Sequence, residues 1–280
     1  MGALLVSIDT GARSKSLITS TIKLAAAFAC TIPFAWMILT ALKSPEEAFT
    51  FSWLPEAPSF DRFFEVFEQA PMGTYIWNSV KITVLVVVGR LIVCSLAGYA
   101  FARLDFRGKN AAFGFLMVAM LLPLLVAIIP LYVVYNEIGW LDTHWPLIIP
   151  PIVSSSFGVF WMRQFYLTVP KELEEAARID GCGTIKTFWS VMLPLSTNSL
   201  ATLGIFTVIS TWNEFFTAVI FLSSPSQYTL PVGLAFFASE SGAQVPIIMA
   251  ATLISMAPIL ILYVFAQRAV IDRMIESGIK

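Results

Sequence analysis

Six long apolar runs constrain this 280-residue chain more than any other feature of its sequence. Each run has about 18 residues or more, the length that a helix needs to cross a bilayer. Backbone groups in lipid must find their partners within the protein, which a helix does inside a single segment. We therefore predict six membrane-spanning helices, at approximately 24–42, 82–102, 111–134, 145–162, 199–222 and 245–266.

The composition agrees with an all-α membrane protein. Of all residues, 58% are hydrophobic and 12% are charged, whereas roughly a quarter are charged in soluble domains. We expect a membrane domain at 24–266, a short segment at 1–23 and a tail at 267–280. Ala27-Phe28-Ala29 mimics a signal-peptide cleavage site, but the apolar run continues to Leu42, which favours a retained span.

The distribution of lysine and arginine predicts the orientation of the spans. Of the 17 such residues, 13 fall in segments on one side, Lys43, Arg62 and Lys81 fall on the other, and Arg90 lies within a span. Cytoplasmic loops carry the excess of positive charge in membrane proteins. Both termini and the loop at 170–196 are therefore predicted to be cytoplasmic.

The sequence offers little for catalysis or cofactor binding. The three cysteines are scattered, the single histidine is His144, and no Gly-x-x-x-x-Gly-Lys-Ser/Thr motif is present. A membrane enzyme would need a catalytic set, but no second acidic residue accompanies Glu214 in its span. We expect no catalytic site, no metal, no cofactor and no nucleic-acid partner for this chain.

The predicted external segment at 44–80 contains an amphipathic pattern. A helix is expected from Asp61 to Gln69, with one aromatic stripe made by Phe60, Phe63, Phe64 and Phe67. Two interpretations remain open at this point. The helix either rests on the membrane and neighbouring spans, or it forms a ledge on which an external binding protein docks.

The segment Pro170–Ser196 concentrates charge in an otherwise apolar chain and is predicted to form two short helices. Pro170 suits the first turn of the first helix, and Gly181 is placed to end it in a left-handed conformation. Thr184 is expected to cap the second helix and Pro194 to end it. An apolar stripe is expected on that second helix, made by Ile185, Phe188, Trp189 and Met192.

This segment carries a family resemblance. Glu175-Ala176-Ala177, then Gly181, Val191 and Leu193-Pro194, resemble the EAA loop of ABC-importer permeases, with Val191 in place of the usual Ile. The segment Thr211–Phe216 resembles the Trp-Asn-(Asp/Glu)-Phe stretch of MalG-like subunits. From about residue 20 to its end, the chain resembles the MalG-like permease subunits of binding-protein-dependent carbohydrate ABC importers. We call residues 170–196 the EAA loop.

The resemblance implies a fold, a function and partners. The fold is that of a type I importer permease, with six spans and a cytoplasmic helix-turn-helix coupling loop. The function is import of a sugar or oligosaccharide across the inner membrane of a prokaryote. The alternative is a polyol, a sugar phosphate or another non-sugar solute. Implied partners are a second, MalF-like permease, two cytoplasmic ATPase subunits that hold ATP and Mg, an extracytoplasmic solute-binding protein, and membrane lipid.

Two sets of residues are singled out. The resemblance implies contact with the ATPase for Glu175, Ala176, Ala177, Asp180 and Gly181. Charged side chains inside spans are costly unless they face a cavity or a partner, and Arg90 and Glu214 lie at similar depth. They are predicted either to pair or to meet water or another subunit separately. Candidate residues of the substrate pathway are Arg90, Ser155, Trp212, Asn213, Glu214, Phe215 and Phe216.

Overall fold

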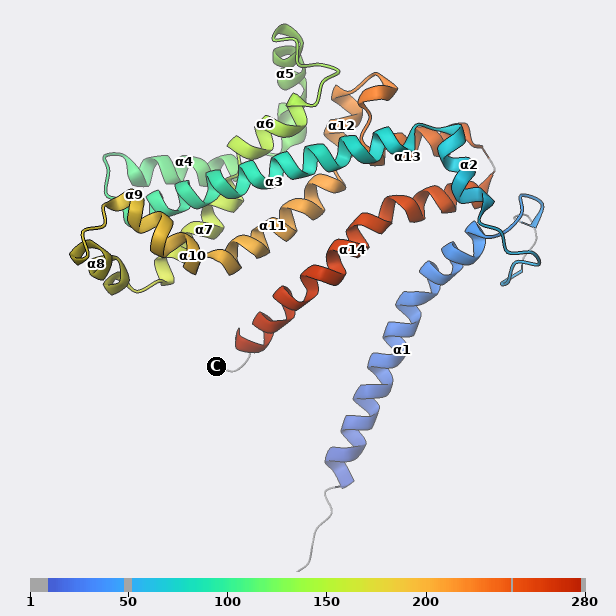
Figure 1. Cartoon of the computed structure of the whole chain (residues 1–280), viewed down its shortest axis with the longest axis horizontal. Helices are drawn as coiled ribbons and strands as arrows, with labels where there is room; N and C mark the ends of the chain where they lie inside the picture. The colour runs from blue at the N-terminus through green and yellow to red at the C-terminus, as the bar shows by residue number, and fades with distance from the viewer. Residues whose placement is uncertain (1–9, 48–51, 243, 278–280) are drawn as a thin grey trace, which may run out of the picture. The chain divides into compact units, whose positions relative to one another are not determined.

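The computed structural model describes residues 10–47, 52–242 and 244–277 (Figure 1). Every long regular element among these residues is an α-helix, as the sequence predicts. The ends of the predicted terminal segments, 1–9 and 278–280, lie outside the described residues. The chain divides into two compact units, Met1–Gln69 with Ala238–Ile254, and Ala70–Phe237 with Ser255–Lys280.

The first unit contains α1 (Thr10–Ala41) and α2 (Asp61–Gln69). Helix α2 has the bounds predicted for the amphipathic helix. Its Val66 is buried, whereas three aromatic side chains of the predicted stripe are at least half exposed: Phe60, Phe64 and Phe67. The aromatic stripe is therefore an outer surface of this unit.

The second unit is organised around α3 (Met72–Arg103), a helix of 32 residues that starts ten residues before the predicted span. The other elements that begin in this unit are α4 (Lys109–Leu121), α5 (Leu124–Glu137), α6 (Trp145–Val153), α7 (Ser156–Thr168), α8 (Lys171–Ile179), α9 (Thr184–Thr187), a π-helical turn (Phe188–Met192), α10 (Leu193–Leu195), α11 (Thr197–Trp212), α12 (Phe216–Phe221), a 3₁₀ turn (Pro225–Gln227) and α13 (Leu230–Glu240). Helix α14 (Val245–Ser277) runs through residues of both units.

Three helices of the described chain are long and apolar enough to cross a membrane, at Thr19–Ala41, Met72–Arg103 and Trp145–Thr168. The number rises to five if each of two bent helix pairs, 109–137 and 184–212, counts as one span. Described residues of α14 add a shorter apolar stretch, Val245–Ile261. The count of six spans stays a prediction.

Three predicted spans are not continuous helices, and the one at 145–162 is divided between α6 and α7. The span at 111–134 breaks at Leu122–Pro123, because proline forces the preceding residue into an extended conformation. The span at 199–222 breaks at Asn213–Phe215. There the Asn213 amide donates to the Ile209 carbonyl at 2.8 Å, and the Glu214 carboxylate accepts from the Thr217 backbone N–H at 3.0 Å. Such local side-chain bonds compete with the helical ladder.

The core of the second unit lies along the C-terminal half of α3. Its buried side chains come from α3, α7, α11 and the π-helical turn: Cys94, Tyr99, Val159, Met162, Tyr166, Val169, Phe188, Met192 and Leu203. Gly98 allows the close approach of α3 and α7, since a Cβ there would lie 2.6 Å from the Cβ of Met162. The π-helical turn belongs to the EAA loop, so this loop is packed into the membrane-domain core.

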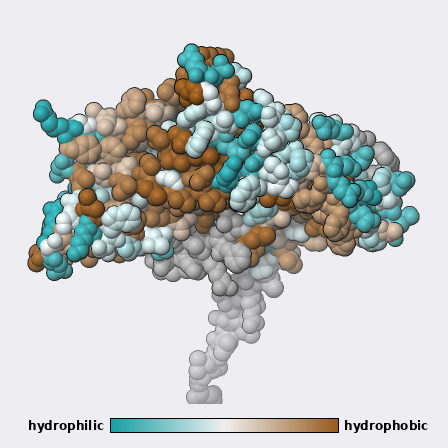
Figure 2. Space-filling view, turned by 45° about the horizontal axis from the view of Figure 1, so that its top comes forward, coloured by the Kyte–Doolittle hydropathy of each residue, from teal (hydrophilic) through white to brown (hydrophobic). Residues whose placement is uncertain are grey.

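Large apolar side chains remain exposed on the outside of several helices. On α3 they follow one face, at Val84, Leu85, Val88, Ile92 and Leu96. Figure 2 shows hydrophobic residues gathered over a broad area of one face of the molecule. Exposed apolar surface on this scale requires lipid or a partner to cover it.

Candidate functional site

The first helix of the EAA loop, α8, ends as the sequence predicts. Gly181 has a φ of 78°, in the left-handed region that favours glycine. Its N–H bonds to the Arg178 carbonyl at 3.0 Å, and the Cys182 N–H bonds to the Ala177 carbonyl at 2.9 Å. These two bonds form a Schellman motif, which ends α8 sharply. At the other end, Pro170 lies just outside the helix rather than in its first turn.

A buried ion pair anchors α8 to the end of α3. Arg103 Nε lies 2.9 Å from Glu174 Oε1, and the two side chains are only 5% and 9% exposed. The two atoms are close but not aligned as a hydrogen bond. Arg103 also donates through Nη2 to the Val169 carbonyl, at the end of α7. One guanidinium therefore joins three elements: α3, α7 and α8.

The predicted coupling residues divide between two faces of α8. Ala177 is buried beside Glu174 and faces the membrane domain. Glu175, Ala176, Asp180 and Gly181 are exposed. The outer face also carries Ile179, which is 87% exposed. It thus combines a carboxylate, a small residue and an apolar side chain, with no described partner.

The second helix of the EAA loop differs from three sequence predictions. Gly183 occupies the N-cap position, so Thr184 is not the cap. Pro194 lies within a helical turn that reaches Leu195, after which the chain bends by 72° into α11. The predicted apolar stripe is divided in two: Phe188 and Met192 are buried, whereas Ile185 is 76% and Trp189 is 57% exposed.

The π-helical turn at Phe188–Met192 is a further difference from the predicted regular helix. The Leu193 N–H reaches back five residues to the Phe188 carbonyl. Pro194 follows at once and has no N–H to donate. The wider turn places Phe188 and Met192 in the core, while their neighbours in the predicted stripe point outward. A helical period of 3.6 residues could not reveal this change of turn.

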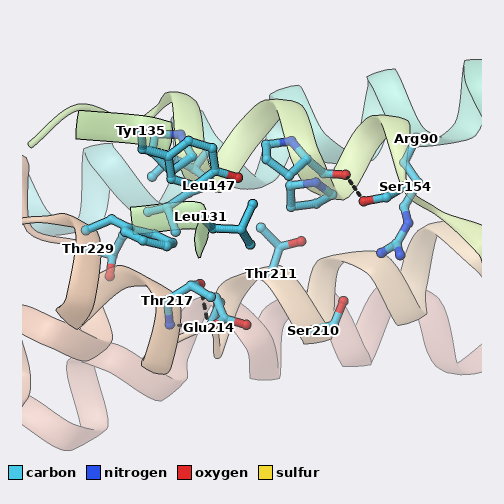
Figure 3. A pocket seen from close by; sticks show the side chains of 15 residues that line it. Arg90, Leu131, Tyr135, Leu147, Ser154, Ser210, Thr211, Glu214, Thr217 and Thr229 are labelled. Atoms are coloured by element: carbon cyan, nitrogen blue, oxygen red, sulfur yellow. Dashed lines mark hydrogen bonds between the residues drawn. The ribbon is translucent and has the colours of Figure 1, made fainter. Parts of the chain in front are cut away.

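A cavity of about 340 Å³ lies among α3, α5, α6 and the α11–α12 break (Figure 3). It is lined by two charged side chains, several hydroxyl groups, two aromatic rings and apolar residues. The lining residues are Ile82, Arg90, Leu131, Tyr135, Pro146, Leu147, Pro150, Pro151, Ser154, Ser210, Thr211, Glu214, Thr217, Phe221 and Thr229. The cavity lies beside the breaks in two predicted spans, those at 145–162 and 199–222.

Arg90 and Glu214 both line this cavity but form no ion pair with each other. Arg90 Nε donates to Ser155 Oγ at 2.5 Å. Glu214 Oε1 accepts from the Thr217 N–H at 3.0 Å and from its hydroxyl at 2.8 Å. The ion pairs among the described residues are those at Arg62–Glu65, Arg103–Glu174 and Asp105–Lys109. The two charged groups are therefore not paired with each other, and each bonds to a different neutral residue.

The other pathway candidates lie around the cavity rather than on its walls. Ser155 is buried behind it, as the partner of Arg90. Trp212 is buried and donates to the Ser255 carbonyl at 3.3 Å. Asn213 bonds to its own helix, and Phe215 and Phe216 are more than 40% exposed outside the lining. Within the Trp-Asn-Glu-Phe segment, Glu214 alone lines this cavity.

Sequence reasoning missed most of the remaining lining. Tyr135, Phe221, Thr211, Thr217 and Thr229 come from four separate segments. Pro150, Pro151 and Ser154 also line the cavity, beside the helix break that follows α6. For the threonines no sequence signal exists, since single hydroxyl residues are common in apolar helices.

A polar clamp fixes the loop after α12 to the start of α6 and α3. The Asp142 carboxylate accepts from the N–H groups of Ser223 and Ser224, at 2.9 and 2.8 Å. The His144 Nε2 lies 2.8 Å from the Gln227 carbonyl. Burial lowers the pKa of His144 below its usual value, although the Gln227 carbonyl acts to raise it. His144, the single histidine of the sequence, thus has a partner far along the chain.

Asn78 extends this clamp to α3. Its amide donates to the carbonyls of Ser226 and Tyr228, at 2.9 and 3.0 Å. The Ser79 hydroxyl next to it accepts from the Leu230 N–H at 2.8 Å. Among the described residues, no group of three or more His, Cys, Asp or Glu side chains comes together as a metal site would require.

Comparison with known proteins decides the family. Residues 91–276 match the family described as "Binding-protein-dependent transport system inner membrane component". The chain belongs to this family of permeases.

Two curated relatives of this permease are sugar transport proteins by name. The arabinooligosaccharides transport system permease protein AraQ of Halalkalibacterium halodurans is 34% identical over 259 residues, covering 91% of this chain and 92% of the relative. The melibiose/raffinose/stachyose import permease protein MelC of Bacillus subtilis is 33% identical over 274 residues, covering 96% and 99%.

The fold is that of a solved ABC transporter chain. The crystal structure of a bacterial ABC transporter involved in the import of the acidic polysaccharide alginate contains a chain that matches this permease with a TM-score of 0.81. The match has 22% sequence identity and covers 93% of this chain and 98% of the other. The expected importer-permease fold is thereby confirmed.

Proposed function

We propose that this permease forms, with a second MalF-like permease, the inner-membrane pathway of an ATP-driven importer for a sugar or oligosaccharide. An extracytoplasmic binding protein delivers the solute, and two ATPase subunits bind ATP and Mg in the cytoplasm. The names of the two relatives support the sugar. The proposal depends mainly on α8. This helix ends sharply at Gly181, its inner face is fixed to the membrane domain by the Arg103–Glu174 ion pair, and its outer face is exposed.

The outer face of α8 suits a groove on an ATPase. Glu175 provides a charge-assisted acceptor for a basic or donor-rich partner, and Ala176 permits close approach. Exposed Ile179 and Ile185 provide apolar area that water disfavours. Ala177 and Asp180 contribute by position: the first packs α8 inward and the second is its C-cap residue.

Movement of the ATPases would reach the pathway through packed elements. Arg103 links α8 to α3, and the buried Phe188 and Met192 link the EAA loop to α7 and α11. A rigid displacement of α8 would therefore shift the walls of the cavity. This is alternating access driven by a two-state element. The alternative substrates, a polyol or a sugar phosphate, would use the same machinery.

A matched pair of carboxylates on α8 tests the coupling role. In proteoliposomes that contain the whole importer, Glu175→Ala is expected to weaken ATPase association by about 1–3 kcal/mol and to reduce ATP-dependent sugar uptake. Glu172→Ala serves as control, since Glu172 is also exposed on α8. Equal uptake by both variants and the unchanged permease would show the loop to be a passive linker.

The orientation has its own test. With the EAA loop in the cytoplasm, an impermeant thiol reagent applied to intact cells is expected to miss Cys182. It is expected to label a cysteine placed at position 65 in α2, within the predicted external segment. The reverse pattern would overturn the orientation, and with it the assignment of α8 to a cytoplasmic ATPase.

A further inference from the structure

The cavity presents a cation and a carboxylate that are held apart. Arg90 comes from α3, and Glu214 comes from the break between α11 and α12. Each is fixed through one part of its charged group, Arg90 by Nε on Ser155 and Glu214 by Oε1 on Thr217. Figure 3 shows the two side chains at separate places on the cavity wall.

The free parts of these groups are the Nη atoms of Arg90 and the Oε2 atom of Glu214. No described residue provides a hydrogen-bond partner for either. A guanidinium can only donate hydrogen bonds, and an ionised carboxylate can only accept them. In a membrane span, leaving both groups without partners is costly. The cavity therefore offers donor groups at one place and an acceptor at another.

The charges restrict the class of that ligand. An anion would gain from Arg90 but would be repelled by Glu214, and a cation would meet the reverse. A neutral polyhydroxylated ring avoids both penalties, because each hydroxyl group both donates and accepts. The cavity volume of about 340 Å³ has room for a sugar ring, at the lower end of the range for small-molecule sites.

The rest of the lining agrees with a carbohydrate. Three hydroxyl-bearing residues, Ser210, Thr211 and Thr229, also line this space, and the Ser210 hydroxyl donates to the Thr207 carbonyl of its own helix at 3.0 Å. Two aromatic side chains, Tyr135 and Phe221, form another part of the wall and pack edge to face at 5.0 Å. Aromatic rings beside hydroxyl and charged groups suit the apolar and polar parts of a sugar ring.

We propose that this cavity is a subsite for one ring of a neutral carbohydrate, in which Arg90 donates to ring hydroxyls and Glu214 accepts from them. The inference rests on the proposed function of the permease and deepens it. It makes Arg90 and Glu214 specificity-determining residues of this subunit.

The test is uptake by proteoliposomes that contain the complete importer and its binding protein. The probes are neutral disaccharides and a matched disaccharide with one uronic acid. Arg90→Gln and Glu214→Gln, which remove charge but little volume, are each expected to raise the KM for the transported neutral sugar about 10- to 100-fold, as for loss of a charged hydrogen bond. Thr211→Val is expected to give a smaller rise.

Arg107→Gln and Glu137→Gln are the matched controls, because both residues are outside the cavity and exposed. They are expected to leave KM unchanged. Thermal unfolding in detergent, together with ATPase association, shows that each variant is folded. Arg90→Lys keeps the positive charge but loses the planar guanidinium with its several N–H donors, and is expected to give an intermediate KM.

The outcomes separate the possible failures. Better uronate uptake by Glu214→Gln, with loss of uronate uptake by Arg90→Gln, would show that the ligand is an anion and overturn the neutral assignment. Unchanged KM in all cavity variants, with uptake still driven by ATP, would overturn the subsite and leave the proposed function standing. Failure of the unchanged importer to take up any carbohydrate would overturn both.

Discussion

Two arginines of α3 differ in how their charge is satisfied. Arg103, at the end of the helix, is buried with Glu174 and also bonds the Val169 carbonyl. Arg90 lies about 20 Å away along the helix axis. It is half-buried and has one neutral partner, the Ser155 hydroxyl. One arginine is surrounded by partners from the protein, and the other lines a cavity.

The difference separates a structural charge from a charge available for binding. Removing one member of a buried ion pair leaves the other uncompensated, so the Arg103 contact is expected to persist through transport. An arginine with free N–H groups can exchange water for a ligand at much lower cost. The two residues thus mark the α8 end and the cavity end of one helix.

The largest expected effect is at Arg103. Arg103→Ala leaves Glu174 buried without its cation and is expected to destabilise the docking of α8 by about 3–5 kcal/mol. Hydrogen exchange of the α8 amides in the assembled importer measures this loss. Arg90→Ala is the comparison, with an expected cost well below that value and no change in α8 exchange. Similar exchange of α8 in both variants would remove the distinction between the two arginines.

Double-mutant cycles sharpen the same comparison. Arg103→Ala with Glu174→Ala is expected to show a coupling energy within the 0.5–3 kcal/mol range of contacting residues, at its upper end for a buried pair, roughly 2–3 kcal/mol. Arg90→Ala with Glu214→Ala is expected to be additive within about 0.3–0.5 kcal/mol in the absence of substrate. Thermal or denaturant unfolding in detergent gives both values. Strong coupling at Arg90–Glu214 would mean that these charges do meet.

A smaller effect is expected at the end of α8. Gly181→Ala forces a Cβ into the left-handed region, at a cost of about 1–2 kcal/mol. No atom lies within 4 Å of the added group, so the penalty is conformational alone. Gly183→Ala is the control, because Gly183 has a φ of −71° and equal space. Equal unfolding temperatures for the two variants would contradict the assigned role of Gly181.

The smallest effect concerns the clamp at His144, away from both arginines. The folded-state pKa is lowered by burial, against the bond to Gln227, with Lys81 lowering it and Asp142 raising it. The unfolded chain therefore binds the proton first, and stability falls as pH drops below about 6.5 toward the lower folded pKa. His144→Gln is expected to remove this part of the pH dependence of unfolding. An unchanged pH profile would show that His144 does not titrate differently on folding.

Sequence alone predicted the helical class, the EAA loop and its glycine cap. These features depend on local signals: apolar length, a proline and glycine spacing, and a short motif. The amphipathic helix Asp61–Gln69 was predicted to the residue for the same reason. That this helix rests on the membrane and neighbouring spans, or that it docks an external binding protein, are both still predictions.

The parts that sequence could not give depend on contacts between distant segments. In the sequence, Glu174 cannot be distinguished from its neighbours Glu172 and Glu175. Only the fold places it beside Arg103. The Arg90–Ser155 bond likewise joins separate helices. The break at Asn213–Phe215 was missed because the apolar run hides the capping bonds of Glu214.

The contact at Gly98 has a kinetic consequence. Helix α3 has no proline from Met72 to Arg103, and at Gly98 its backbone meets that of α7. The two helices have no space in which to turn against each other between the two arginines. Fluorescent reporters placed near Arg90 and near Arg103 would therefore relax with a single rate constant after ATP is added, with no delay from one end to the other.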